Sequence, residues 1–446
     1  MMRMRLAGVM AGSLLMVGAC SSATTTDAES STTESSTTQS AQTISGTPPS
    51  ASPAATGRSG TFGVSGAAAA DPASAADLTD FINRFKGENN LRAVLVRVTR
   101  GDDILLEEAV GQSMTGVPAT TDMHFRNGAV AISYMSTLLL ILVDEGKVSL
   151  DDKVSTWLPD IPHTDEVTLR QLAQMTSGYV DYESTPELTA ANYADPYKQW
   201  TPQELLAFAV GKPLWYAPGT NWDYAHTNYV ILGLALEQIT GQPLNEVLQQ
   251  KVLDPLGLAN TSGNAGTPSI PEPVLHAFTS ERREVLKVPA DIPLYEEATF
   301  WNPSWTLAQG AIQTTNLHDL SVTARGINSG RLLSSESYQA FATTDLRGKT
   351  SAVPGCPACF EQSIGYTYGL GVVISGDWLL QDPLFSGESA VGAYLPAQDV
   401  AIAVAVTYEP AAFDPTTGAY PNTADQLWRE IAVKVVPDNP PPIKKG

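Results

Sequence analysis

Residues 130–145, VAISYMSTLLLILVDE, are apolar on nearly every side of the helix that they predict. A helix without a polar face has to be covered all round, so this segment predicts a fully buried helix. Gly146 follows it and suits the left-handed position that commonly ends a helix. A bilayer-crossing helix needs about 20 apolar residues, whereas this segment is shorter and contains Ser133, Ser136 and Thr137. We therefore expect it to lie in the core of a globular domain.

The segments on either side predict an α/β (α+β) fold in which both ends of the domain share one sheet. A β-hairpin is predicted early, with its two strands joined at Gly101-Asp102. A second buried helix is predicted in the middle and ends at Gly241. Strands and a closing amphipathic helix are predicted last. These expectations rest on residues 78–87 and 92–111, on 228–241, and on 366–375, 399–409 and 423–436.

The N-terminal residues are typical of an exported protein. Arg3 and Arg5 precede an apolar stretch, residues 6–17, that is too short to span a bilayer. The small residues of VGAC then lead to Cys20, which resembles a bacterial lipobox. We interpret residues 1–19 as a lipoprotein signal peptide and Cys20 as the lipidated first residue of the mature chain. An ordinary secretory signal with an incidental cysteine is the alternative.

Composition then divides the rest of the chain. Residues 20–75 are rich in Ser, Thr, Ala and Pro and have few large apolar side chains, which predicts a disordered stalk that could carry O-linked sugars. One folded domain is predicted for residues 76–436, and a flexible tail for residues 437–446. The net charge of −21 makes nucleic acid an unlikely partner.

Two further cysteines, Cys356 and Cys359, lie in PGCPACFE. In an oxidising compartment such a pair is expected to form a disulfide. A C-x-x-C sequence can also be a redox site or half of a zinc site. A second ligand pair is missing and no βαβ pattern surrounds it, so we interpret it as a disulfide that staples a local loop.

Six segments, in order, resemble the serine β-lactamase and D-alanyl-D-alanine carboxypeptidase superfamily, in the branch of class C β-lactamases and related esterases. The resemblance covers about residues 78–436 and implies an antiparallel sheet flanked by helices, with a mostly helical subdomain. The segments are HFRNGAVAIS, LILVDEGKVSLDDKVSTWLPDI, VTLRQLAQMTSG, APGTNWDYAHTNYVILGLALEQITG, DPLGLANTS and YGLGVV.

The resemblance implies a catalytic S-x-x-K at the start of the buried helix. Its serine attacks a carbonyl group, and its lysine, one turn later on the same face, helps to remove the serine proton. Here Ala129 stands in the place of the serine and Ile132 in the place of the lysine. A methyl group cannot attack a carbonyl, and a hydrocarbon side chain cannot accept a proton. No lysine anywhere in the chain has a serine three residues before it, so an S-x-x-K does not occur elsewhere.

Two further stations implied by the resemblance are also altered. The Y-x-N station reads Tyr224-Ala225-His226, so the tyrosine is kept and the amide is replaced. For the H-x-G or K-T-G station, which supplies a cation or donor for the substrate carboxylate, we expect Phe385-Ser386-Gly387, with looser spacing than usual. The GKTS at residues 348–351 precedes the YGLG strand and is therefore in the wrong place.

Other chemistries have weaker support. The sequence around Ser389 nearly matches a G-x-S-x-G elbow, but Val391 replaces the last glycine and no histidine follows His318. The histidines form no H-E-x-x-H pair, so no metal site and no cofactor are predicted; they are His124, His163, His226, His276 and His318. Tyr224 and His226 could do acid–base work or only form hydrogen bonds within a vestigial pocket. Trp301, Trp305 and Phe385 could line a ligand pocket or belong to the core.

We therefore predict a lipid-anchored pseudoenzyme on the extracytoplasmic face of a bacterial cell membrane. Membrane lipid is the expected partner of Cys20, and the vestigial cleft would bind an envelope small molecule, a peptidoglycan fragment or a protein. The alternative is an esterase, peptidase or β-lactamase-like hydrolase that uses non-standard residues such as Tyr224 and His226. A structural lipoprotein without a ligand would instead have a collapsed cleft.

Overall fold

A computed structural model describes residues 73–263 and 267–443. The predicted signal peptide, Cys20 and almost all of the predicted stalk lie outside these residues. In the described part of the chain, no helix combines the length and the apolar character that crossing a bilayer requires.

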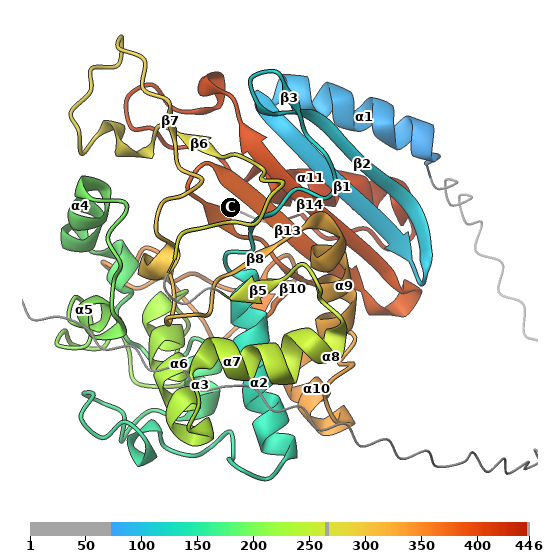
Figure 1. Ribbon diagram of the computed structural model, residues 1–446. Helices are drawn as coiled ribbons and strands as arrows, with labels where there is room; N and C mark the ends of the chain where they lie inside the picture. The colour runs from blue at the N-terminus through green and yellow to red at the C-terminus, as the bar shows by residue number, and fades with distance from the viewer. Residues whose placement is uncertain (1–72, 264–266, 444–446) are drawn as a thin grey trace, which may run out of the picture. The chain divides into compact units, whose positions relative to one another are not determined.

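A nine-stranded antiparallel sheet joins the two ends of the domain, as the sequence predicted (Figure 1). Eight of its strands run in the order β3-β2-β1-β14-β13-β11-β10-β9. The ninth strand, β12, lies outside this order and pairs with β13. Smaller sheets have the orders β4-β8-β5 and β6-β7. The strands are β1 Leu91–Arg100, β2 Asp103–Met114, β3 Val117–Pro118, β4 Phe125–Arg126, β5 Ser262–Gly263, β6 Phe278–Thr279, β7 Glu296–Glu297, β8 Gln313–Thr315, β9 Thr367–Tyr368, β10 Val373–Ser375, β11 Trp378–Gln381, β12 Leu384–Phe385, β13 Glu388–Leu395 and β14 Val400–Tyr408.

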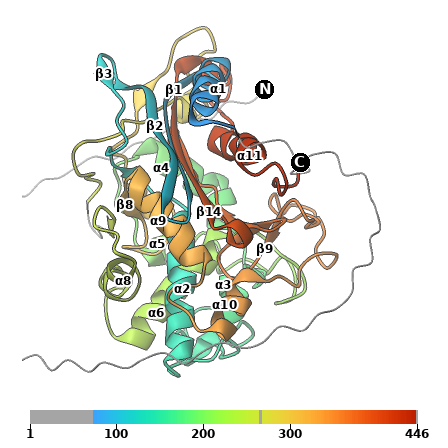
Figure 2. The same cartoon turned by 90° about the vertical axis from the view of Figure 1, so that its right-hand side faces the viewer.

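Helices cover both faces of this sheet (Figure 2). Helices α1 and α11 pack together on one face, and α9 packs against β1, β13 and β14 on the other. The helices are α1 Ala75–Glu88, α2 Val130–Asp144, α3 Leu169–Ala173, α4 Pro186–Ala194, α5 Pro202–Leu206, α6 His226–Thr240, α7 Leu244–Leu248, α8 Asp254–Leu256, α9 Leu317–Asn328, α10 Ser335–Ala342 and α11 Thr423–Val435. Short turns of helix are η1 Val154–Thr156, η2 Tyr182–Ser184, η3 Gln249–Leu253, η4 Glu281–Arg283, η5 Pro303–Trp305, η6 Pro396–Gln398 and η7 Pro410–Ala412.

The central strands are buried on both faces because helices cover both sides of them. Every residue of β13 and β14 is buried, and most of their side chains are correspondingly apolar; Glu388, Ser389 and Thr407 are the strongly polar exceptions. Strand β1 pairs with β14 along its length and with β2 through the turn at Gly101. The predicted hairpin and the shared sheet are therefore both present.

Helix α2 lies at the centre of the helical part, as its sequence predicted. Twelve of its residues are buried, and it packs against α6, α9 and α10. Gly146 follows it with φ 68°, and Gly241 ends α6 with the same φ. These left-handed positions favour glycine because a Cβ is disfavoured there.

Residues 437–443, predicted to begin a flexible tail, contact the domain. The backbone oxygen of Asn439 accepts a hydrogen bond from Trp378 Nε1 at 3.1 Å, and that of Pro442 accepts one from Arg429 at 3.2 Å. Ile443, at the end of the described residues, is 88 % exposed.

Candidate functional site

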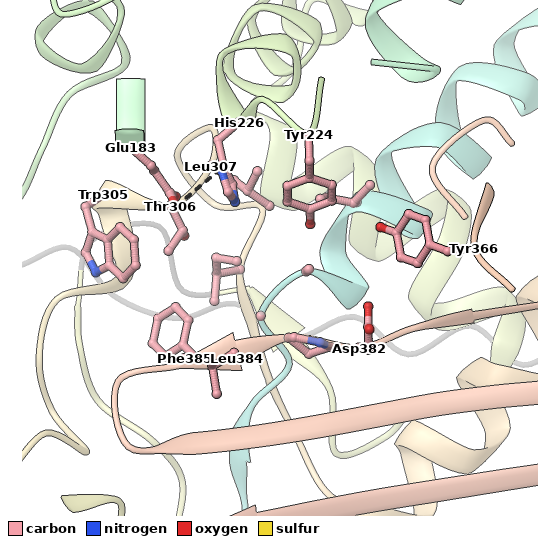
Figure 3. A pocket seen from close by; sticks show the side chains of 15 residues that line it. Glu183, Tyr224, His226, Trp305, Thr306, Leu307, Tyr366, Asp382, Leu384 and Phe385 are labelled. Atoms are coloured by element: carbon pink, nitrogen blue, oxygen red, sulfur yellow. Dashed lines mark ion pairs between the residues drawn. The ribbon is translucent and has the colours of Figure 1, made fainter. Parts of the chain in front are cut away.

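A cavity of about 280 Å³ opens where the start of α2, the start of α6 and the β11–β12 segment meet (Figure 3). Its wall is mainly apolar and aromatic, and its aliphatic residues include Ile132, Leu307 and Ile312. Its charged members are Glu183, His226 and Asp382. This cavity contains two of the three stations that the sequence predicted, the S-x-x-K position and the Y-x-N position.

Ala129 and Ile132 both line the cavity, so the substituted pair belongs to its wall. Two hydrogen bonds fix Asn127, which lies just before α2. Its Nδ2 donates to Gln313 Oε1 at 2.7 Å, and Gln313 N–H donates to its Oδ1 at 3.0 Å. At Gly128 the φ is 49°, and a Cβ there would lie 2.6 Å from the side chain of Pro383. These contacts fix the backbone from which α2 and the two apolar side chains enter the cavity wall.

Tyr224 and His226 meet in the same cavity, with ring centroids 5.2 Å apart. His226 is the first residue of α6, and its backbone N–H donates to Asp181 Oδ1 at 3.0 Å. Its imidazole Nδ1 lies 3.4 Å from Asp181 Oδ2 and 3.3 Å from Glu183 Oε2. The histidine therefore contacts two acidic side chains, and Figure 3 marks the contact with Glu183 by a dashed line.

The protonation states of this cluster follow from burial and from its charges. Burial alone would lower the pKa of His226, but Glu183 and Asp181 outweigh it and raise that pKa to about 9. Burial raises the pKa of Glu183 to about 8 although His226 opposes it. At neutral pH the imidazole is thus mainly a cation, and the acidic groups beside it offset its charge.

The segment predicted as the third station lines the cavity only in part. Asp382, Pro383, Leu384 and Phe385 line the cavity, whereas Gly387 does not. Gly387 occupies the turn between β12 and β13, where a Cβ would lie 2.3 Å from the backbone oxygen of Phe278. The turn of the β12–β13 hairpin therefore lies outside the cavity wall. Asp382 is the acidic side chain that this segment contributes to the cavity wall.

Of the three aromatic residues that could line a pocket or belong to the core, two line the cavity and one does not. Trp305 and Phe385 line the cavity and stack with ring centroids 5.7 Å apart and an interplanar angle of 20°. Trp301 does not line it: its side chain is 3 % exposed and packs against Tyr193. Trp301 is thus a core residue, and Trp305 is a wall residue.

Ser389 has no role in this cavity. It lies in β13, which continues as a strand and not as the helix that a nucleophile elbow requires. Its Oγ is 2.6 Å from Tyr408 Oη, and the residue is 2 % exposed. The remaining histidines, His124, His163, His276 and His318, do not line the cavity either.

Two groups of side chains could offer three ligand atoms to a metal ion, although the sequence predicted no metal site. One is Asp181, Glu183 and His226. The other is Asp223 with Cys356 and Cys359, and these cysteines are joined by the disulfide that the sequence predicted.

Asp181, Glu183, Tyr366 and Asp382 are site residues that the sequence did not single out. Burial raises the pKa of Tyr366 well above its usual value, and Asp382 adds to the effect. A partial signal existed for one of them, because Asp382 lies just before the segment that was assigned to the third station.

Comparison with known proteins agrees with this geometry. The family model described as Beta-lactamase matches residues 78–423. Penicillin-binding protein 4* of Bacillus subtilis is 27 % identical over 179 residues, which are 39 % of each chain. Esterase EstB of Burkholderia gladioli is 30 % identical over 197 residues, 41 % of this chain and 50 % of that protein. These alignments span half or less of the curated relatives.

Solved structures share the fold over a longer span. A D-stereospecific amidohydrolase from Streptomyces sp. has a TM-score of 0.63 at 24 % identity, covering 75 % of this chain and 94 % of its own. The D-amino acid amidase of Ochrobactrum anthropi SV3 has a TM-score of 0.64 at 20 % identity, covering 81 % and 99 %. At such identities the likeness concerns the fold alone.

Proposed function

Since this chain belongs to the β-lactamase family, we propose that it is a member without acyl-enzyme chemistry that uses its cleft to bind a ligand of the bacterial cell envelope. The observation that supports this most directly is the position of Ala129 and Ile132 in the wall of the cavity. By analogy with other serine hydrolases, loss of the nucleophile alone lowers turnover on the order of a millionfold.

The other hydroxyl groups of the cavity are poor substitutes for a catalytic serine. Thr306 Oγ1 donates to the backbone oxygen of Pro303 at 2.7 Å, and no described lining residue is a lysine that could remove its proton. Burial raises the pKa of Tyr224 and of Tyr366 well above the usual value, so both phenols stay neutral at physiological pH. The site lacks a base-activated nucleophile.

The charge of the cavity indicates the chemistry of the ligand. No lysine or arginine lines it among the described residues, and His226 is already paired with Glu183 and Asp181. Asp382 adds negative charge to the wall. A free carboxylate would therefore be repelled, whereas an amide or an amine beside an apolar or sugar face would suit Trp305 and Phe385.

Export and anchoring are part of the proposal and are supported by the sequence of residues 1–20. Two or more acyl chains hold a protein durably on a membrane. Replacing Cys20 by Ser in the full-length chain should move the protein out of the membrane fraction. An unchanged distribution would remove the anchor from the proposal.

The first test is covalent labelling of the full-length protein. After incubation with benzylpenicillin and with a cephalosporin, the intact mass should be unchanged, because Ala129 offers no hydroxyl group to acylate. A penicillin-binding protein that does acylate, treated in parallel, provides the positive control. An adduct that peptide mapping places on a residue of the cavity wall would refute the loss of acyl chemistry.

Ligand binding is tested by calorimetry with matched peptidoglycan fragments that end in a carboxamide or in a free carboxylate. The carboxamide should bind at least about tenfold more tightly, a difference of about 1.4 kcal/mol. Trp305→Ala should weaken both ligands alike, since it removes the aromatic wall and no charge. Equal or stronger binding of the carboxylate would contradict the charge argument.

Hydrolysis without an acyl-enzyme is a second candidate, and one observation favours it. Glu183, with a pKa raised to about 8, lies 3.3 Å from His226 in an open cavity, so the pair could move a proton to or from a bound water. Turnover of a chromogenic ester or D-amino acid amide that is abolished by Glu183→Gln would establish it. Absence of turnover leaves the binding function.

A further inference from the structure

The disulfide between Cys356 and Cys359 lies beside a buried acid that has no hydrogen-bond partner. Asp223 is 2 % exposed, and neither of its carboxyl oxygens has a partner among the described residues. One carboxyl oxygen and the two Sγ atoms all lie within 4.8 Å of one another. Asp223 directly precedes Tyr224 of the cavity wall, and its backbone N–H donates to Met175 O at 3.2 Å.

The burial of the Asp223 carboxyl group without a hydrogen-bond partner among the described residues lowers the stability of the folded protein. A buried polar group without a partner destabilises a protein by about 1–3 kcal/mol, and more when it is charged. The ionisable groups that act on Asp223 are Asp181, His226 and Tyr216, and none of them bonds to it. A disulfide offers no donor to the acid, whereas two thiols would each offer an S–H group. Reduction of the disulfide would therefore supply the hydrogen bonds that Asp223 lacks.

We propose that Cys356 and Cys359 form a thiol–disulfide exchange site, in which Asp223 gives and takes the proton of a cysteine. The co-reactant is a thiol, either a small molecule or a protein dithiol. Its thiolate attacks one cysteine sulfur, the S–S bond breaks, and a mixed disulfide forms. The other cysteine leaves as a thiolate and takes the proton of the Asp223 carboxyl group. A second external thiolate then breaks the mixed disulfide, so the external thiol is oxidised and both cysteines are reduced.

The balance of this exchange is complete. The two external thiols release two protons when they ionise. One proton returns to the Asp223 carboxylate, and the other protonates the second cysteine. Two electrons pass from the external thiols to the cysteine pair, and no other oxidant or reductant is needed.

The loop that carries the disulfide is placed to admit such a partner. Pro354, Gly355 and Pro357 are exposed, while Cys356 and Cys359 lie just beneath at 7 % and 5 % exposure. The ring of Phe360, on the same loop, lies 5.5 Å from that of Tyr366 in the cavity wall. The loop is therefore in contact with the cavity wall through this aromatic pair.

The test is the rate at which dithiothreitol and glutathione reduce this disulfide in the folded, full-length protein. Alkylation and mass spectrometry would distinguish Cys356 and Cys359 from Cys20. Burial raises the pKa of Asp223 to about 7, with Asp181 adding to the shift and His226 opposing it. The rate constant per reductant thiolate should therefore fall about tenfold or more between pH 6 and pH 8.5, as Asp223 loses the proton that it donates.

Asp223→Asn keeps the shape and removes the proton, so reduction at pH 6 should be at least about tenfold slower than in the unchanged protein. The two should converge at pH 8.5. Glu281→Gln, which alters a half-buried acid whose pKa burial also raises to about 7, should leave the rates unchanged. A pH-independent rate constant in the unchanged protein overturns the proposal even if Asp223→Asn fails to fold. A disulfide that resists both thiols until the protein unfolds also overturns it.

Discussion

Between pH 5 and pH 8 the free energy of unfolding should fall by about 3 kcal/mol or more. Four acids are responsible, two of them buried (Glu388 and Asp223) and two half-buried (Glu183 and Glu281), because burial raises the pKa of Glu183 and Glu388 to about 8 and that of Glu281 and Asp223 to about 7. In the unfolded chain these groups lose their protons near pH 4. The folded state therefore binds more protons across this range.

The sign follows from linkage. Stability falls with rising pH wherever the folded state holds more protons than the unfolded state. The contribution of each acid is complete below its unfolded pKa and is lost as the pH rises through its folded pKa. His226 acts in the same direction, since its pKa rises from 6.5 to about 9 on folding, so its contribution fades between those values. Most proteins with salt-bridged carboxylates behave in the opposite way at acid pH.

Urea unfolding at pH 5, 6, 7 and 8, at constant ionic strength, measures the effect. Glu281→Gln should match the unchanged protein at pH 5 and exceed its stability at pH 8, since the charge that burial penalises is gone. Asp77→Asn, at the exposed start of α1, is a surface control whose profile should run parallel to that of the unchanged protein. Stability that increases steadily from pH 5 to pH 8 would contradict the burial of these acids.

The parts of the fold that were predictable are those with a clear hydrophobic pattern. Helix α2 was predicted because its residues are apolar on nearly every side, and the β1–β2 hairpin from two β-rich segments joined at Gly101. The tail was less predictable. Its sequence is polar and proline-rich, yet Asn439 bonds to Trp378, a contact that depends on tertiary position alone.

In the site, motif position singled out Ala129, Ile132, Tyr224 and His226, and all four line one cavity. Gly387 does not line it, because the register of the β12–β13 hairpin decides which residues of that segment face the cavity. Such a register depends on turn geometry and pairing, which spacing alone does not determine.

The acids around His226 could not be predicted because they are distant in the chain. Asp181 lies 45 residues before His226 and reaches it through η2, a short turn without periodicity. Asp223 is similar: its sequence neighbours are aromatic, and the disulfide that it approaches lies far along the chain. Contacts of this kind are set by the packing of loops.

Gly371→Ala should destabilise the protein by about 4 kcal/mol or more, or prevent folding. Gly371 belongs to the YGLG segment and has φ 74°, where an L side chain is strained. A Cβ there would lie 2.2 Å from Ser136 Oγ and 2.7 Å from Tyr229 Oη. These two hydroxyl groups are themselves 2.7 Å apart and buried, and Tyr229 Oη donates to Ala173 O at 2.8 Å. The added methyl group would break this buried network.

Gly146→Ala separates backbone strain from the clash. Gly146 has φ 68°, but nothing lies within 4 Å of a Cβ at that position. Its cost should therefore be only the left-handed penalty of about 1–2 kcal/mol, so the difference between the variants measures the clash. Gly371 O also accepts hydrogen bonds from Ser133 at 2.8 Å and from Gln381 at 2.7 Å, and Gln381 adjoins Asp382 of the cavity wall. A folded Gly371→Ala protein should thus lose cleft ligand binding while Gly146→Ala retains it. Equal denaturation midpoints for the two variants would show that α2 and the YGLG segment are not packed as described.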